Sequence, residues 1–411
     1  MPKRKALIIG GSLAGLFAAN LLRGIGCEVE VFERVTDEMS GRGAGIVTHP
    51  ELFEALARCG IPVDAGLGVE VSSRVVLDRH GQVVDRYVLK QLMTSWGRVY
   101  GLLKSALPDE AYHAGFTLER VEQDNSHVTA LFANGARAVG DLLVAADGIR
   151  SSVRAQFLPD VRPAYAGYVA WRGLVDEQAL SAATHAALFD KFGFCLPVSE
   201  QMLGYPVAGA ESNAKPGQRR YNFVWYRPAD EFAVLRDLLT DGQGHTHEIS
   251  IAPPLIRAEL IDGLRRDAEA LLAPQFAEIV RLTEQPFFQP IYDVESPRLV
   301  FGKVVILGDA AFTARPHVAM GVTKASSDAI TLADALASAG SNWVSGLSLF
   351  EAKRLTVGAS IIARARHLGA YMQAQAKTEL ERNMAERYRT PERVLRETAT
   401  PPPFASVDGS P

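Results

Sequence analysis

The sequence has little cysteine, no long basic run and no strong excess of one charge. Cys27, Cys59 and Cys195 lie far apart and form no C-x-x-C pair, which argues against a disulfide framework, a zinc cluster and disulfide-reductase chemistry. The net charge of −4 gives no indication of nucleic-acid binding. Because isolated thiols fit a reducing compartment, we expect a cytoplasmic protein.

The first residues imitate a secretory signal, since Lys3, Arg4 and Lys5 precede an apolar stretch at 6–22. Gly10, Gly11 and Ser12 interrupt that stretch, and residues 27–33 continue with strand-like alternation. We therefore interpret the segment as folded structure. No other segment is long and apolar enough to span a bilayer, so no membrane partner is expected.

A chain of 411 residues exceeds the size that a single core supports well, so we expect two domains. Periodicity predicts an opening strand, helix and strand, which together form a βαβ unit. Strands of a second sheet are expected at 168–173, 192–197, 202–206 and 221–226. Helices are expected at 52–58, 99–107, 326–337 and 347–382, followed by a loose tail containing three prolines from Pro401.

The first motif is Gly10-Gly11-Ser12-Leu13-Ala14-Gly15, between the first strand and its helix, with Glu33 placed 33 − 15 = 18 residues later. This spacing is typical of a dinucleotide site. Gly10 allows the tight turn, Gly15 allows close helix packing, and the helix amides bind a pyrophosphate. Ser12 departs from the usual glycine, and its hydroxyl must face the ligand. An ordinary βα turn is the less favoured alternative, because strand, turn, helix and acid occur together.

Two later strands also end in an acidic residue. Asp147-Gly148 follows one apolar strand and Gly308-Asp309 follows another. Acids at the carboxyl ends of sheet strands lie where α/β proteins bind ligands. Each alone could be a helix cap. Together with the first motif, they predict that Glu33, Asp147 and Asp309 converge on one extended nucleotide.

These three motifs, in this order and spacing, resemble the flavoprotein aromatic hydroxylases of the para-hydroxybenzoate hydroxylase type, and the resemblance runs to about residue 337. It implies an α/β fold in which a β-sheet substrate domain is inserted into a Rossmann-like FAD-binding domain, with C-terminal helices. The expected FAD-binding domain is 1–70, 95–160 and 285–345, the substrate domain is 71–94 and 161–284, and the C-terminal helices and tail are 346–411.

The resemblance also assigns cofactor contacts. Residues 10–15 would hold the FAD pyrophosphate, Glu33 the adenosine ribose, and Asp309 the ribityl and pyrophosphate part, while Asp147-Gly148 is linked to both FAD and NAD(P)H. The other expected cofactor residues are Arg34, Arg42, Gly45, Ile46, Tyr100, Pro316, Ala319, Met320 and Gly321. Arg42 could equally be a solvated loop residue.

The departures from the family are Phe312, where many members have histidine, Tyr100, where arginine is common, and residues 316–321 in place of a glycine-rich flavin loop. The segments 308–325 and 165–168 look like the hydroxypyridine-hydroxylating members. The substrate is therefore expected to be a hydroxypyridine or another small, electron-rich aromatic ring.

The resemblance implies that NADH or NADPH reduces FAD, that reduced flavin captures molecular oxygen as a hydroperoxide, and that its terminal oxygen goes to a ring carbon. A general base near a ring hydroxyl would assist, and a dry pocket would slow peroxide release. His317 is the first candidate for base or substrate contact, at even odds with a structural role. His49 and Tyr205 are second candidates, for which a structural role is favoured. Trp225, Tyr226 and Phe194 either wall the pocket or are core.

Two other functions remain open at this point. A related flavin dehydrogenase or reductase would share the motifs without inserting oxygen, and a non-catalytic flavin-binding scaffold would fit the departures at Phe312 and Tyr100. A reductase with two nucleotide-binding domains is disfavoured, because no second glycine-rich fingerprint occurs. A homodimer is what the resemblance implies.

Overall fold

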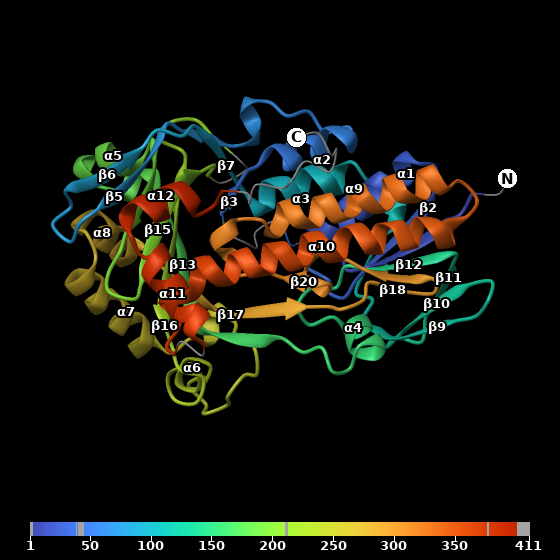
Figure 1. The fold of residues 1–411 in the computed structure, drawn as a ribbon. Helices are drawn as coiled ribbons and strands as arrows, with labels where there is room; N and C mark the ends of the chain where they lie inside the picture. The colour runs from blue at the N-terminus through green and yellow to red at the C-terminus, as the bar shows by residue number, and fades with distance from the viewer. Residues whose placement is uncertain (1–2, 38, 40–44, 210–212, 376–377, 401–411) are drawn as a thin grey trace.

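The structure is a computed structural model that describes residues 3–37, 39, 45–209, 213–375 and 378–400. It has two main sheets, with long helices running between them (Figure 1). The predicted α/β class, with a nucleotide-binding sheet, a second sheet and C-terminal helices, is confirmed. The prolines from 401 and the expected contact Arg42 lie outside the described residues.

The first sheet has six strands in the order β18-β19-β12-β1-β2-β8. Its four central strands are parallel and consist mainly of buried apolar residues, as expected for a sheet covered on both faces. The strands are β1 (Lys5–Ile9), β2 (Glu28–Glu33), β8 (Tyr112–Ala114), β12 (Leu142–Ala145), β18 (Val300–Phe301) and β19 (Val304–Ile306). A three-stranded sheet adjoins it, formed by β9 (Leu118–Gln123), β10 (Val128–Phe132) and β11 (Arg137–Gly140).

Strand register places the ends of the first sheet level with one another. Ile9 at the end of β1 pairs with Phe32 of β2 and with Ala145 of β12, and Ala145 pairs with Ile306 of β19. The turns that follow these strands therefore lie side by side, although their residues are far apart in sequence.

The second sheet has eight strands in the order β20-β17-β13-β16-β15-β14-β5-β6. The strands are β5 (Ser73–Leu77), β6 (Val83–Tyr87), β13 (Ala164–Asp176), β14 (Lys191–Cys195), β15 (Gln201–Val207), β16 (Arg220–Pro228), β17 (Phe287–Glu295) and β20 (Phe312–Thr313). A small sheet is formed by β3 (Gly45–Val47), β7 (Gln91–Ser95) and β4 (Val69–Val71), and its strands β4 and β7 contact β15 of the second sheet.

The register of β17 bears on the expected domain boundary at residue 285. β17 forms an antiparallel pair with β13 of the eight-stranded sheet, in which Trp171 pairs with Phe288. A division at 285 would therefore cut through this sheet. We propose that the substrate domain includes β17 and that the chain returns to the first domain after Glu295.

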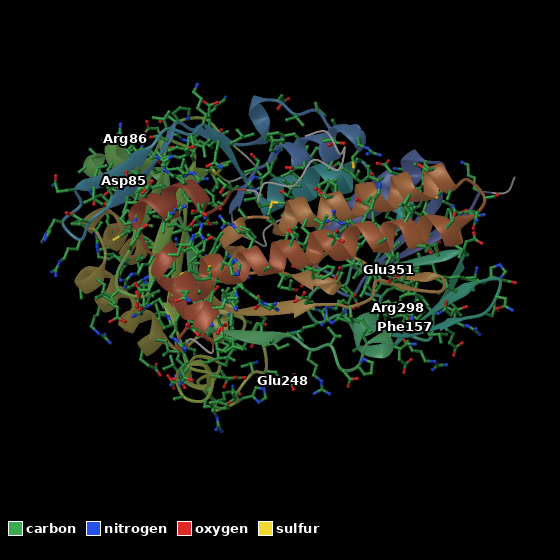
Figure 2. All side chains as sticks on the ribbon, in the orientation of Figure 1. Asp85, Arg86, Phe157, Glu248, Arg298 and Glu351 are labelled. Atoms are coloured by element: carbon green, nitrogen blue, oxygen red, sulfur yellow. The ribbon has the colours of Figure 1, made fainter. Side chains whose placement is uncertain are left out.

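Helices cover the sheets on both sides. α1 (Leu13–Gly24) and α9 (Gly321–Ala339) pack on each other, and α10 (Trp343–Gly369) runs along α9 toward the second sheet (Figure 1). Glu351 of α10 accepts hydrogen bonds from the backbone of Leu299 and Val300, which ties the edge of the first sheet to this helix (Figure 2). The remaining α-helices are α2 (Pro50–Arg58), α3 (Trp96–Ser105), α4 (Ser152–Phe157), α5 (Ala182–Leu188), α6 (Val234–Leu238), α7 (Ala258–Leu271), α8 (Pro274–Leu282), α11 (Glu379–Tyr388) and α12 (Pro391–Glu397).

The predicted single helix at 347–382 is wrong. α10 ends at Gly369, where a Cβ atom would lie 2.5 Å from the Tyr168 hydroxyl, so the chain passes closely over the second sheet and turns. A new helix, α11, begins after Thr378, whose side chain and that of Glu381 form a capping box. α11 and α12 then cover the inner face of the second sheet, and α12 was not predicted. No helix among the described residues is long and apolar enough to cross a membrane.

Candidate active site

A cavity of about 480 Å³ lies where β1, β2, β12 and β19 end. The three predicted acids, Glu33, Asp147 and Asp309, all line it. The three acids thus converge on one cavity, and their contact with a nucleotide stays a prediction. The other lining residues that sequence analysis expected are Gly10, Ser12, Leu13, Ala14, Arg34, Gly148 and Gly321.

The turn after β1 is shaped for close approach of a ligand. Gly10 has φ +103°, and a Cβ atom there would lie 2.4 Å from the carbonyl oxygen of Ala146. Gly15 lies against the Gly10 carbonyl, where a Cβ would come within 1.9 Å. Ser12 is the N-cap of α1, yet its hydroxyl makes no capping hydrogen bond. The hydroxyl is therefore available to a ligand, as the departure from glycine requires.

Glu33 is buried, and its carboxylate accepts hydrogen bonds from two backbone amides. Oε2 accepts a hydrogen bond from the amide of Gly11 at 2.8 Å, and Oε1 accepts one from Val35 at 2.9 Å. These bonds fix the glycine turn against the end of β2. Each carboxylate oxygen retains a further lone pair that a ribose hydroxyl can use.

Asp147 caps a helix and also lines the cavity, so it combines the two alternatives that the sequence left open. Its Oδ2 accepts from the amide of Ser152 at 2.8 Å and so caps α4, while Oδ1 is buried and has no hydrogen-bond partner in the part of the chain that the structure describes. Arg154 of the same helix donates to the carbonyl of Ala310 at 2.9 Å. The loops after β12 and β19 are thereby locked together beside the cavity.

Asp309 faces the cavity and is accessible from it, although protein surrounds it. The surrounding protein removes water from the carboxyl group and so raises its pKa, while the nearby positive charge of Lys324 lowers it. Beneath it, Asp328 accepts from the amide of Gly308 at 2.9 Å and pairs with Arg354 at 2.6 Å. Lys324 is 1% exposed, and its amine has no hydrogen-bond partner among the described residues. The loop after β19 thus rests on a buried cluster of charges.

Tyr100 and Gly308 do not line the cavity. Tyr100 is buried behind Trp96, with ring centroids 4.8 Å apart, and Trp96 forms part of the wall instead. Gly308 has φ +62°, and a Cβ there would lie 2.8 Å from Ala14. It allows close packing of the last loop on α1.

Gly45 and Ile46 connect the first domain to the second sheet. The amide of Gly45 donates to Oδ1 of Asn222 at 3.1 Å, and a Cβ on Gly45 would lie 2.9 Å from the Tyr205 hydroxyl oxygen. Tyr205 and Asn222 are paired neighbours on β15 and β16. Tyr205 is buried, and burial raises the pKa of its phenol, so it stays protonated at physiological pH.

The segment 316–320 packs into the same apolar cluster as Tyr205. It forms a short 3-10 helix over Pro316–Val318, followed by Ala319 in the left-handed region with φ +52°. His49 hydrogen-bonds to the backbone of Ala319, and burial lowers the pKa of His49 to about 4. Met320 and Val318 pack into the apolar cluster on the inner face of the second sheet. His49 therefore supports the segment that carries His317.

His317 is 1% exposed and sits among aromatic and basic side chains. Its Nε2 lies 2.7 Å from the Tyr168 hydroxyl, and the Tyr226 ring meets it edge-on with centroids 4.4 Å apart. Burial, together with Arg315 and Arg172, lowers the pKa of His317 to about 3. Its imidazole is therefore neutral, and Nδ1 is buried without a partner among the described residues.

Trp225, Tyr226 and Phe194, which were predicted either to wall the substrate pocket or to form core, lie in different surroundings. Tyr226 faces His317, whereas its neighbour Trp225 belongs to the cluster on the other face of the sheet, under α7 and α8. Phe194 is fully buried and stacks on Phe192, so it is core. Strand alternation explains the difference between Trp225 and Tyr226.

Sequence analysis missed several residues of both regions. Trp96, Arg150 and Ser152 line the cavity, and Arg154 and Lys324 organise its loops. Asn222, Arg172, Tyr168, Arg315 and Asp293 gather near His317 and Tyr205. A signal existed for Arg150, Ser152 and Arg154, which follow Asp147 closely in sequence. The resemblance gave a signal for Tyr168, Arg315 and Lys324 too, because they lie in the segments 165–168 and 308–325.

Comparison with known proteins agrees with this geometry. Residues 3–191 match the family model of an FAD binding domain, and residues 165–293 match an FAD binding domain-like model. The chain is 34% identical to the 2,6-dihydroxypyridine 3-monooxygenase of Paenarthrobacter nicotinovorans, over 80% of this chain and 81% of that protein. The chain belongs to the FAD-dependent aromatic hydroxylases.

Other members of the aromatic hydroxylase family match at similar length. The 6-hydroxynicotinate 3-monooxygenase of Pseudomonas fluorescens is 28% identical over 84% of this chain and 86% of that protein. The solved structure of 2,6-dihydroxypyridine-3-hydroxylase from Arthrobacter nicotinovorans superposes with a TM-score of 0.85 at 31% identity, covering 92% of this chain and 94% of that one. The predicted enzyme class, an FAD-dependent monooxygenase of aromatic rings, is thereby confirmed.

Proposed function

We propose that this hydroxylase uses NADH or NADPH and molecular oxygen to hydroxylate a hydroxypyridine or a similar small N-heteroaromatic ring. One observation carries the proposal: Trp96 of the cavity wall directly follows Ser95, and the strand partner of Ser95, Gly45, donates to Asn222 in the buried polar cluster on the second sheet. The similarity to hydroxylases named for hydroxypyridine and hydroxynicotinate substrates supports the ring type.

The residues present fit FAD. Two helix N-termini, those of α1 and α9, reach the cavity at Ser12 and Gly321, and their partial positive charge suits a pyrophosphate. The unpartnered Oδ1 of Asp147 and the cavity-facing carboxyl of Asp309 suit hydroxyl groups of the ribose and ribityl chains. When bound, FAD supplies the electron transfer between the nicotinamide and oxygen that no side chain can provide.

The second-sheet cluster would bind and orient the ring. Tyr226 offers an aromatic wall, His317 and Tyr205 offer polar atoms, and Arg172 offers a cation whose Nε has no partner among the described residues. Positive charge beside the ring lowers the pKa of a ring hydroxyl, which raises electron density on the ring carbons. Apolar neighbours such as Val318 and Val224 exclude water. His317, Tyr205 and His49 keep their predicted roles as proposals, with His49 the most structural of the three.

The test is turnover by purified, FAD-loaded protein on a panel of hydroxypyridines and phenols. We expect NAD(P)H oxidation to be stimulated at least tenfold by the true substrate, and product mass to rise by one oxygen atom drawn from ¹⁸O₂. Stimulated oxidation without ¹⁸O in the product would indicate a dehydrogenase or reductase. Bound FAD with no stimulation by any ring would indicate a non-catalytic scaffold.

The resemblance also supports a homodimer in the cytoplasm. Light scattering on the purified FAD-loaded protein measures the mass directly, and a monomer mass of 44.5 kDa would remove the dimer from the proposal.

A further inference from the structure

A buried chain of polar contacts stands behind His317. The hydroxyl of Tyr168 lies 2.7 Å from Nε2 of His317, and both residues are at most 1% exposed. On its other side Tyr168 neighbours Arg315, whose guanidinium carbon lies 5.8 Å from the tyrosine ring centroid. Arg315 is held by Asp293 at 3.0 Å. These contacts fix where each proton can lie.

The direction of the Tyr168 hydrogen bond follows from the chemistry of its neighbours. A guanidinium group carries only donors, so the tyrosine proton cannot point to Arg315. Burial raises the pKa of the Tyr168 phenol well above its usual value, which keeps that proton on the tyrosine. The hydroxyl therefore donates to His317, and Nε2 accepts.

An imidazole that is neutral and accepts at Nε2 must carry its own proton on Nδ1. Nδ1 is buried and has no partner among the described residues. Turning the ring over would replace Nε2 with a carbon and lose the bond to Tyr168. An unpaired buried N–H is costly, so a hydrogen-bond acceptor beyond the described residues is expected there.

We propose that His317 donates a hydrogen bond from Nδ1 to an oxygen of the ring substrate, and that Tyr168 and Arg315 are positioning residues that hold this tautomer. The acceptor is a deprotonated ring hydroxyl or a ring carbonyl oxygen, as hydroxypyridines and their pyridone forms provide. The inference rests on the proposed function for the identity of the ligand. The tautomer itself does not depend on it.

His317 is then a donor and not the general base. A ring hydroxyl gives its proton to bulk water before the ring binds, because Arg172 and Arg315 lie near His317 and favour an anion there. Tyr168, Tyr226 and Tyr205 stay protonated, since burial raises the pKa of each, that of Tyr226 to about 12. The enzyme selects substrates by the oxygen they present to Nδ1.

The first experiment is ¹⁵N NMR of histidine-labelled protein as purified, with His317 assigned by loss of its signals in His317→Gln. We expect a protonated Nδ1 and an acceptor-type Nε2 from pH 5 to 8. Tyr168→Phe should shift the Nε2 signal and mix the tautomers. Tyr221→Phe, which removes another buried hydroxyl from the opposite face of the same sheet, should leave both signals in place. A protonated Nε2 in the wild-type protein would overturn the tautomer.

The second experiment compares kinetics of FAD-loaded Tyr168→Phe and Tyr221→Phe. We expect Tyr168→Phe to raise the substrate KM about tenfold and to release more peroxide per NAD(P)H, which is the size of effect for one well-placed hydrogen bond. Equal KM values in the two variants, with the expected tautomer seen by NMR, would overturn the substrate contact alone. Absence of turnover on every ring would instead contradict the proposed function, and the NMR result would still decide the tautomer.

Discussion

His317 lies in the short segment 316–320 and His49 contacts the backbone of that segment at Ala319, and both histidines are neutral. Burial lowers the pKa of His49 to about 4 and that of His317 to about 3, from an ordinary value near 6.5. In the unfolded chain both histidines take up protons below that value. The fold must exclude those protons to keep the segment 316–320 in place.

This difference predicts a pH dependence of stability. As the pH falls from about 6.5, the unfolded state binds protons that the folded state refuses, so the free energy of unfolding should fall by about 1.4 kcal/mol per pH unit for each histidine. Urea denaturation at pH 7.0, 6.0 and 5.0 measures it. In His317→Gln the free energy of unfolding should fall less steeply with pH, by about 1.4 kcal/mol per pH unit. The same change at the exposed His80 should leave this slope as it is in the wild type. Equal slopes in the three proteins would contradict the depressed pKa of His317.

At the residue level, the sequence predicted the nucleotide cavity better than the substrate cluster. The glycine turn and the acids are local signals, because each follows directly from a strand end. Tyr168, Arg172 and Asn222 carry no such signal. Their role depends on which face of a strand is turned toward His317 and on which strands are neighbours, and both are set by the tertiary fold. For the same reason Trp225 could not be separated from Tyr226.

At the level of elements, the C-terminal helices hold the inner face of the second sheet. Arg74 of β5 is fully buried and donates to the carbonyl oxygens of Leu395, Thr398 and Ala399. The amide of Ala399 in turn donates to the carbonyl of His317 at 2.7 Å. The end of α12 is thus attached to the segment that carries His317.

Arg74→Met should release this attachment. Leaving buried carbonyl groups unpaired should lower the free energy of unfolding by about 3 kcal/mol. Limited proteolysis should then cut first within residues 389–400, and the substrate KM should rise. The matched control is Arg79→Met, a change at an exposed position near the same strand, which should stay within about 0.5 kcal/mol of wild type. Equal stability of the two variants would show that Arg74 does not hold the C-terminal segment.

Element boundaries were predicted where the pattern was local and missed where packing decided them. The βαβ opening follows from its own periodicity. The break in the long helix does not, because residues 347–382 show continuous helical character and the chain turns only where Gly369 meets Tyr168 of the second sheet. The helical pattern of α12 is short, and its position depends on Arg74, far away in sequence.

At the level of the whole molecule, the nucleotide cavity exists only when three distant segments meet. β1, β12 and β19 come from residues 5–9, 142–145 and 304–306, and their register aligns the turns. A ligand that bridges these turns binds the folded state alone. FAD should therefore stabilise the whole protein by about 2.7 kcal/mol at a concentration one hundred times its Kd.

Gly10→Ala should abolish this stabilisation. The new Cβ would collide with the Ala146 carbonyl in a conformation that only glycine adopts easily, so the turn and β12 must separate. Thermal unfolding with and without added FAD measures the effect. Gly24→Ala, at the end of α1 where a Cβ meets no atom within 4 Å, should keep the full FAD-induced shift. An unchanged shift in Gly10→Ala would place the FAD pyrophosphate elsewhere.

The contact between Ala399 and His317 also orders events during synthesis. The glycine turn, the acids at 147 and 309 and the strands of the second sheet are all translated before α12. The contact behind His317 can form only after a further 399 − 317 = 82 residues have been translated. We therefore expect ring hydroxylation only after α12 has folded against β5.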